Sequence, residues 1–177
     1  GMEYPGAVLI TDRLYNAGNE NSLEYVVVHE VAHQWWYGMI GNDEIDDPWL
    51  DEAPTEYSTL LYYRDRYGDA RFDREYQTNV GLPLSVLTRS GTPMKVGDPI
   101  SAYSDGLWYN IVVYKRGAQM FYDLHQELGD AAFFGAMQRY FKAMFLLNAK
   151  KGDLYEALSK ETGCDWSGHL ERYLNGG

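Results

Sequence analysis

Residues 23–36 read LEYVVVHEVAHQWW, and residues 49–57 read WLDEAPTEY. In the first stretch the apolar residues recur at helical spacing, and this pattern predicts a buried helix over 23–38. The second stretch opens another helix, predicted over 51–67, with Gly68 as its stop signal. Histidines interrupt the first pattern and acidic residues interrupt both, and these polar positions are the candidates for chemistry.

The HEVAH segment (29–33) places two imidazoles four residues apart on the first helix. This spacing turns the second ring by only about 40° around the helix and raises it by about 6 Å, so both rings face one point. Neutral imidazoles bind Zn²⁺ well, and a catalytic zinc site takes three protein ligands and keeps one position for water. Glu52 follows His33 after 18 intervening residues and can reach the same point from the second helix. We therefore predict one zinc ion bound by His29, His33 and Glu52.

Two further glutamates on these helices have predicted roles in the chemistry. Glu30 is displaced by about 100° from His29 around the helix, so it borders the open coordination position instead of binding the metal. There it can act as a general base that takes a proton from the zinc-bound water and passes it to the leaving amine. Glu56 lies one turn after Glu52 on the same face, where it can accept the outer ring N–H of a ligand histidine.

Composition and charge argue against several other classes of protein. The formal net charge of the 177 residues is −11, so the field of the protein repels phosphate backbones and we expect no nucleic-acid partner. Cys164 is the single cysteine, which rules out an internal disulfide. No run approaches the roughly 18 apolar residues of a membrane span, and no signal-peptide pattern is present. We expect a soluble fragment without a transmembrane segment, of unknown compartment.

The rest of the chain predicts helices and little sheet. The apolar run 7–11 follows a Pro-Gly turn and predicts one short edge strand. Further helices are expected at 69–88, 108–128, 130–146, 153–162 and 166–174. The predicted fold class is mainly α, with one short edge strand, two helices that supply the zinc site, and a helical bundle. We expect a single catalytic fragment over 1–177, in which 1–67 holds the strand and zinc-site helices and 68–177 closes the cleft.

Four segments, in order along the chain, resemble motifs of a known family. They are GME (1–3), HEVAHQWW (29–36), WLDE (49–52) followed by Glu56-Tyr57, and YKRGA (114–118). In this order they are similar to the GxMEN, HExxHxW, WLNEGFAEY and Tyr-x-Lys-Gly-Ala segments of the gluzincin zinc aminopeptidases, typified by aminopeptidase N. The resemblance implies a truncated, thermolysin-like catalytic region, because in that family a large N-terminal β domain and most strands of the catalytic sheet precede the first segment.

The same resemblance assigns roles to residues that the helix patterns do not single out. Glu3, with backbone from Gly1 and Met2, would bind the free α-amino group of a peptide. A fixed carboxylate beside the metal favours a cationic N-terminus over an internal peptide bond. Tyr114 would donate a hydrogen bond to the oxyanion of the tetrahedral intermediate.

The predicted function is that of a zinc-dependent aminopeptidase, which hydrolyses the N-terminal peptide bond of peptides with a free N-terminus. The preferred N-terminal residue and the oligomeric state do not follow from the sequence. Departures from the family at Tyr4, 53–54 and 115–116 affect the geometry of the amine site and the side-chain preference, not the zinc ligands. Two alternatives stay open: a zinc endopeptidase with the same HExxH plus Glu site, and an inactive zinc-stabilised interaction fragment.

Overall fold

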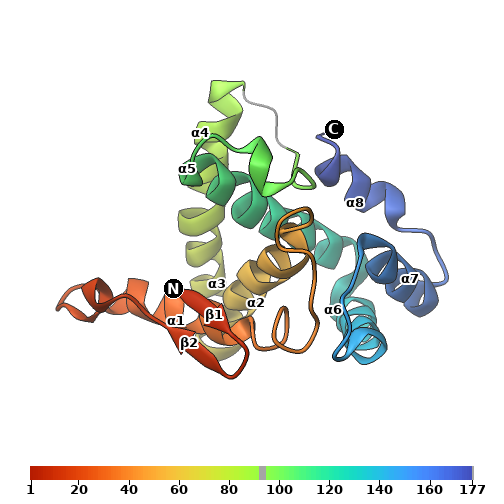
Figure 1. The fold of residues 1–177 in the computed structure, drawn as a ribbon, viewed down its shortest axis with the longest axis horizontal. Coiled ribbons are helices and arrows are strands. Elements are labelled where there is room, and N and C mark those ends of the chain that lie inside the picture. The colour runs from red at the N-terminus through yellow and green to blue at the C-terminus, as the bar shows by residue number, and fades with distance from the viewer. Residues whose placement is uncertain (92–94, 177) are drawn as a thin grey trace.

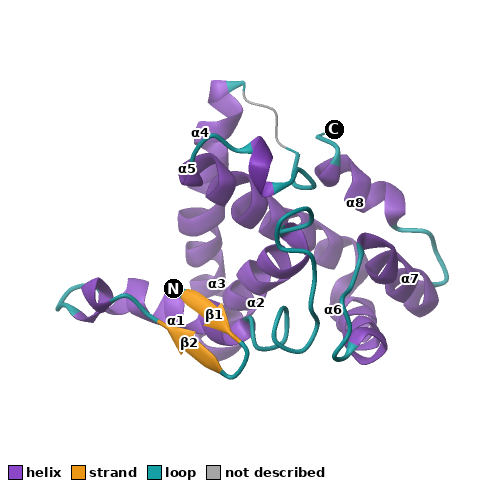
Figure 2. Ribbon diagram, in the orientation of Figure 1, coloured by secondary structure: helices purple, strands orange, loops and turns teal. Residues whose placement is uncertain are grey.

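The computed structural model describes residues 1–91 and 95–176, and most of these residues are helical. The strands are β1 (Met2–Tyr4) and β2 (Ala7–Leu9), and the α-helices are α1 (Glu20–Ala32), α2 (Trp49–Tyr67), α3 (Asp69–Tyr76), α4 (Leu82–Ser90), α5 (Gly106–Tyr109), α6 (Gly117–Met144), α7 (Lys151–Thr162) and α8 (Ser167–Leu174). Short 3₁₀ turns lie at η1 (Asp12–Tyr15) and η3 (Ile100–Ala102), and π-helical segments lie at η2 (Gln77–Gly81) and η4 (Asn110–Arg116). Figure 1 shows the hairpin and α1 at one end of the molecule and α7 and α8 at the other. Figure 2 shows how little of the chain is strand, so the mainly α fold class is confirmed.

The strand expected over 7–11 is present as β2, but it does not stand alone. It pairs antiparallel with β1, so that Glu3 lies opposite Val8. Pro5 and Gly6 form the connecting turn, and Gly6 has a φ of 79°, which glycine adopts without strain. Gln34 holds this turn against the end of α1, because its side chain accepts a hydrogen bond from Gly6 N (2.7 Å) and donates one to the carbonyl of Tyr4 (3.1 Å).

The first zinc-site helix is shorter at its C-terminal end than the predicted 23–38. α1 ends at Ala32, and His33 is its C-cap. Beyond this point the backbone bonds no longer follow one regular pattern: Gln34 N bonds to the carbonyl of Val31 (i−3), Trp36 N to that of Ala32 (i−4) and Gly38 N to that of His33 (i−5). The chain therefore leaves the helix axis directly after the second histidine.

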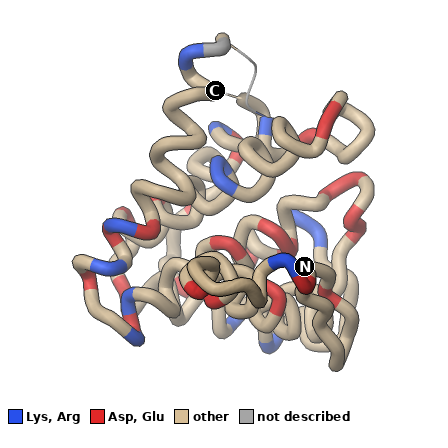
Figure 3. Tube along the Cα trace, turned by 90° about the vertical axis from the view of Figure 1, so that its left-hand side faces the viewer, with Lys and Arg blue, Asp and Glu red and all other residues tan. Residues whose placement is uncertain are grey.

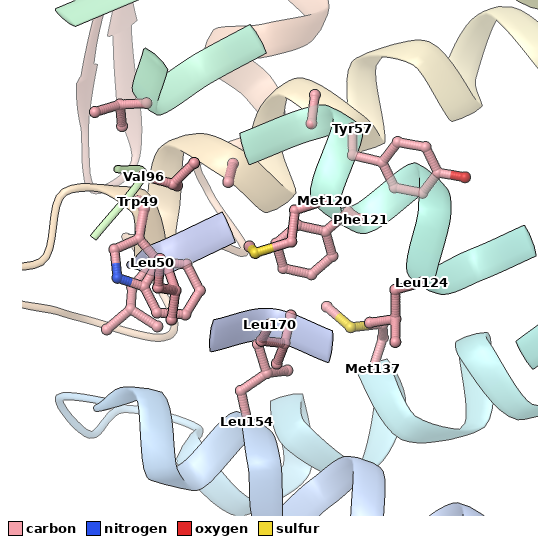
Figure 4. Close-up of a cluster of buried hydrophobic side chains, with 14 of the residues drawn as sticks. Trp49, Leu50, Tyr57, Val96, Met120, Phe121, Leu124, Met137, Leu154 and Leu170 are labelled. Atoms are coloured by element: carbon pink, nitrogen blue, oxygen red, sulfur yellow. The ribbon is translucent and has the colours of Figure 1, made fainter. Parts of the chain in front are cut away.

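The second zinc-site helix, α2, runs through the middle of the molecule and supplies much of the core. It begins at Trp49, two residues before the predicted start, and Pro54 lies inside it. Trp49, Leu50 and Tyr57 are buried against residues of α6, and Figure 4 shows Met120, Phe121 and Leu124 in this cluster. The cluster continues to Leu154 of α7 and Leu170 of α8, so a single core supports α2.

Gly129 divides the longest helix where the sequence predicts a boundary. It has a φ of 73° and a ψ of 164° inside α6, which separates the predicted helices 108–128 and 130–146. The first of these is itself heterogeneous, because α5 passes into the π-helical segment η4 before α6 begins. No described helix is long and apolar enough to cross a membrane.

Candidate metal centre and pocket

The ends of two helices bring the three predicted metal ligands together. α1 carries His29 in its last turn, His33 follows its last residue, and Glu52 lies in the first turn of α2. Nε2 of His29 lies 3.1 Å from Nε2 of His33, and each of these nitrogens lies 3.2 Å from Oε2 of Glu52. All three side chains are buried. The three atoms form a nearly equilateral triangle.

This triangle fits a zinc ion in its size and in its donor chemistry. Ligand atoms at about 2.0–2.1 Å from a tetrahedral zinc ion lie about 3.3 Å from one another, close to the separations in the triangle. Nδ1 of His33 faces the carbonyl of Trp36 and the hydroxyl of Thr55, each at 3.2 Å. A proton on Nδ1 can be donated to the Trp36 carbonyl, and this tautomer leaves the Nε2 lone pair directed at the triangle. Two imidazoles and a carboxylate are a common ligand set of catalytic zinc.

The carboxylates around His29 make this site attractive to positive charge. Burial lowers the pKa of His29, but the neighbouring carboxylates of Glu52 and Glu56 outweigh burial and raise it to about 10. Burial raises the pKa of Glu52, but the two histidines outweigh it and hold the pKa at about 2. A divalent cation bound at the triangle would take the place of a proton on these groups, because metal ligands bind in their deprotonated form.

Glu56 lies beside Nδ1 of His29, the ring nitrogen that does not face the triangle. Its Oε2 is 3.0 Å from Nδ1 of His29, at ion-pair distance but outside good hydrogen-bond alignment. Its Oε1 accepts a hydrogen bond from the Tyr25 hydroxyl at 2.6 Å and contacts the ammonium of Lys115. Burial raises the pKa of Glu56, but Lys115 and His29 outweigh burial and keep the carboxyl ionised.

Glu30 is buried beside the triangle and borders the same pocket. Its Oε1 lies 3.6 Å from the nitrogen of Gly1. Its Oε2 finds no hydrogen-bond partner among the described residues. A buried carboxylate oxygen without a protein partner is open to a water or a substrate proton, as a general base must be.

Tyr114 reaches the triangle from the π-helical segment η4. Its hydroxyl donates to Oε1 of Glu52, and its ring stacks on that of His29 with 5.6 Å between centroids. Burial and the charge of Glu52 raise the pKa of Tyr114 well above its ordinary value, so the hydroxyl stays protonated and can donate. π-helical turns occur frequently at functional sites, because they displace side chains from the regular helical positions.

The hairpin brings Glu3 to the rim of the pocket. A carboxylate oxygen of Glu3, a ring nitrogen of His33 and a carboxylate oxygen of Asp51 lie within 4.8 Å of one another. Burial raises the pKa of Glu3. Gly1 also lines the pocket, whereas the described lining does not include Met2, whose side chain points to the other face of the strand.

The predicted site residues other than Met2 share one pocket of about 300 Å³. Its described lining is Gly1, Glu3, Tyr25, Val26, His29, Glu30, His33, Glu52, Glu56, Asn110, Tyr114 and Lys115. A larger cavity of about 700 Å³ lies between the second half of α6 and α7, and it contains none of the predicted site residues. The other two histidines, His125 and His169, are buried packing residues away from the pocket.

Several residues of the site were not assigned a role from the sequence. Lys115 was noted only as a departure from a motif, although it pairs with Glu56. Tyr25 lies four residues before His29, so helical spacing could have placed it on the same face of α1. Gln34 follows the second histidine directly and positions the hairpin. No local pattern indicates this contact, because the atoms it joins are far apart in sequence.

Comparison with known proteins identifies similar sequences along almost the whole chain. Aminopeptidase N of Lactococcus lactis subsp. lactis is 27% identical over 179 residues, which cover 98% of this chain and 21% of that protein. Aminopeptidase N of Lactobacillus delbrueckii subsp. lactis is 31% identical over 143 residues, which cover 77% of this chain and 16% of that protein. The chain thus spans about a fifth of the length of these relatives.

The fold is also that of solved M1 zinc metallopeptidases. A mutant of the Deinococcus radiodurans enzyme bound to a Tyr-Ser-Ala substrate matches with a TM-score of 0.66 and 20% identity, over 90% of this chain and 34% of that one. The Deinococcus radiodurans metallopeptidase without the mutation matches with a TM-score of 0.64 and 22% identity. The Peptidase family M1 domain matches residues 1–173 of this chain. The chain therefore belongs to peptidase family M1.

Proposed function

We propose that this chain is the catalytic part of a zinc aminopeptidase, which hydrolyses the N-terminal peptide bond of peptides. The triangle of His29, His33 and Glu52 carries the proposal, because its 3.1–3.2 Å edges suit one zinc ion. The relatives named aminopeptidase N and the family M1 match support the same reaction class.

Each residue around the triangle has a separate task in this reaction. When bound, zinc would polarise the scissile carbonyl and lower the pKa of a bound water towards about 7. Glu30, with its free Oε2, takes a proton from the attacking water and delivers it to the leaving amine. Tyr114 exchanges its bond to Glu52 for one to the oxyanion and stabilises the charge that develops there.

Glu3 sets the register of the substrate. Its carboxylate lies beside His33 at the pocket rim, together with Gly1, and attracts the protonated N-terminus of a peptide. An internal peptide segment has no such charge, so it loses this contact and leaves the half-buried carboxylate of Glu3 without a cationic partner. The proposed substrates are therefore peptides with a free α-amino group, such as the Tyr-Ser-Ala bound in the structure of one relative.

We also propose separate roles for the two parts of the chain. Residues 1–67 carry the hairpin and the zinc-site helices, and residues 68–177 close the cleft, with Tyr114 as their contribution to the chemistry. Because the relatives are about five times as long, we propose that this region works within a longer protein, beside an N-terminal β domain.

The decisive variant is Glu30→Gln, which removes the base and keeps the shape of the side chain. It should still bind one zinc ion per chain and should lower kcat by about 10²- to 10⁴-fold. Metal analysis and hydrolysis of an aminoacyl-p-nitroanilide measure these two quantities. An unchanged rate would remove Glu30 from its proposed role.

A substrate comparison separates the aminopeptidase from an endopeptidase with the same zinc site. A tripeptide with a free N-terminus should be cleaved far faster than its N-acetylated form, and Glu3→Gln should reduce this difference. Equal rates for the two peptides would favour the endopeptidase. Zinc binding without cleavage of either peptide would favour an inactive zinc-stabilised interaction fragment.

A further inference from the structure

Two neighbouring residues of η4 hold two glutamates of α2 in the same manner. Glu52 and Glu56 lie one turn apart on α2, and Tyr114 and Lys115 are consecutive in η4. The hydroxyl of Tyr114 donates a hydrogen bond to Oε1 of Glu52, and the ammonium of Lys115 donates one to Oε1 of Glu56. The remaining Oε2 atoms of the two glutamates face Nε2 and Nδ1 of His29, respectively. The imidazole of His29 thus lies between two carboxylates, and a residue of η4 donates a hydrogen bond to each carboxylate.

Lys115 is built into this arrangement and is not a mobile surface lysine. Its side chain is 13% exposed, and its ammonium lies 5.6 Å from the centre of the Tyr25 ring. The Tyr25 hydroxyl bonds to the same Oε1 of Glu56, so two donors fix one carboxylate oxygen and direct the other at His29. A buried carboxylate requires such a counter-charge. Lys115 is the only lysine or arginine among the described residues that line the pocket.

We propose that Lys115 is a positioning residue of the metal centre: through Glu56 it fixes the orientation of His29 and thereby the geometry that binds zinc. This inference rests on the proposed zinc site. Residues that orient metal ligands typically change metal affinity by 10- to 100-fold when they are substituted. Because Lys115 follows Tyr114 directly, a single turn of η4 would set both the oxyanion donor and the ligand orientation.

The test measures the zinc dissociation constant of the full chain by competition with a chromophoric chelator. Lys115→Met should weaken zinc binding by about 10- to 100-fold. Lys115→Arg keeps the charge beside Glu56 and should bind zinc more tightly than Lys115→Met. Lys160→Met is the matched control, because Lys160 is an exposed lysine of α7 paired with Glu156 on the surface, and it should leave the constant unchanged.

A double-mutant cycle with Glu56→Gln distinguishes positioning from a general loss of structure. If Lys115 acts through Glu56, adding Lys115→Met to Glu56→Gln should weaken zinc binding no further. If Lys115→Met alone does not fold, this comparison still decides, because the double variant leaves no unpaired charge buried. Additive losses, or a single variant that binds zinc like the wild type, would overturn the inference.

A second measurement follows the histidine itself. ¹⁵N NMR of the imidazoles in the zinc-loaded chain should show one fixed tautomer for His29 in the wild type and exchange between orientations in Lys115→Met. If the wild type binds zinc and cleaves peptides, and Lys115→Met has the same zinc dissociation constant and the same His29 tautomer, only the positioning role is contradicted. A wild type that binds no zinc would sink the proposed function, and the inference with it.

Discussion

At the scale of single residues, the two nitrogens of one imidazole meet two different carboxylates. Nε2 of His29 lies 3.2 Å from Glu52, and Nδ1 lies 3.0 Å from Glu56. Both carboxylates belong to α2, one helical turn apart. The i, i+4 spacing that directs the two histidines to one point is therefore repeated by the two glutamates opposite them.

Tyr114 gives a prediction that separates catalysis from metal binding. Tyr114→Phe removes the hydroxyl that would donate to the oxyanion, so kcat should fall by about 10²- to 10³-fold. The variant retains His29, His33 and Glu52, so the zinc content at saturating zinc should not change. Steady-state kinetics and metal analysis check both points. Tyr155→Phe, which removes a hydroxyl bonded to Glu171 on α8, should keep full activity. Equal activity of Tyr114→Phe and the wild type would contradict the assigned role.

His125 gives a prediction for pH that does not involve the metal site. Its Nδ1 lies 2.6 Å from the Tyr57 hydroxyl, and its ring stacks on Phe133. Burial lowers the pKa of His125 below its ordinary value of 6.5, although Asp130 opposes this shift. The unfolded chain therefore takes up this proton first, and the folded state loses stability as pH falls below 6.5.

The matched variant for this effect is His125→Gln, which keeps a polar partner for Tyr57. Its deficit in the free energy of unfolding should shrink as pH falls from 7 to 5, because only the wild type carries the cost of burying a titrating imidazole. Asp130, whose pKa is lowered from 3.8, does not titrate in this range. Urea denaturation at several pH values measures the difference. A deficit that stays constant or grows towards pH 5 would contradict the prediction.

At the scale of elements, the sequence predicted what depends on local spacing and missed what depends on distant contacts. Helical periodicity predicted the facing positions of His29, His33 and Glu52. The backbone freedom of glycine predicted the break at Gly129. The hairpin of β1 and β2 is joined to the end of α1 by Gln34, which bonds to the turn at Gly6 across 28 residues. No periodic pattern contains that contact.

The π-helical segment η4 is the second feature that local patterns did not predict. Its residues have the composition of an ordinary helix, and the sequence predicted one over 108–128. The structure places Tyr114 and Lys115 at adjacent glutamates of α2 from within this segment. Its geometry is stabilised by tertiary contacts, because Ile111, Val112 and Val113 are buried in the core. The family resemblance supplied Tyr114, but helical spacing alone could not.

Gly129 allows a direct test of how α6 is divided. Its φ of 73° and ψ of 164° lie in a region restricted almost entirely to glycine, so Gly129→Ala should lower the free energy of unfolding by about 1–3 kcal/mol. A methyl group there would meet no atom within 4 Å, so the loss would come from the backbone and not from a clash. Gly152→Ala, near the start of α7 and equally open, should be neutral or stabilising by up to about 1 kcal/mol. Urea denaturation compares the two, and equal stability of both variants would contradict this account of the break.

At the scale of the whole molecule, acidic residues and the candidate pocket lie together at the hairpin end. Figure 3 shows acidic positions gathered around the N-terminus of a chain whose net charge is −11. The acidic pocket lies there, whereas the larger cavity beside α7 has charged side chains of both signs, such as Arg139 paired with Glu161. The size of a cavity does not identify the site in this fold; the convergence of donor atoms does.

The chain spans about a fifth of the length of its relatives, yet it brings every predicted ligand into one place. The core of α2, α6, α7 and α8 is continuous, so the zinc-site helix α2 is supported from within this chain. We therefore expect the metal centre to form in these 177 residues themselves.

The most direct test of this account is anomalous X-ray diffraction at the zinc edge on crystals of the zinc-loaded chain. One zinc ion should lie about 2.0–2.2 Å from Nε2 of His29, Nε2 of His33 and a carboxylate oxygen of Glu52, with no protein atom in the fourth position. A fourth protein ligand, or a zinc ion held instead by Glu3, His33 and Asp51, would contradict it.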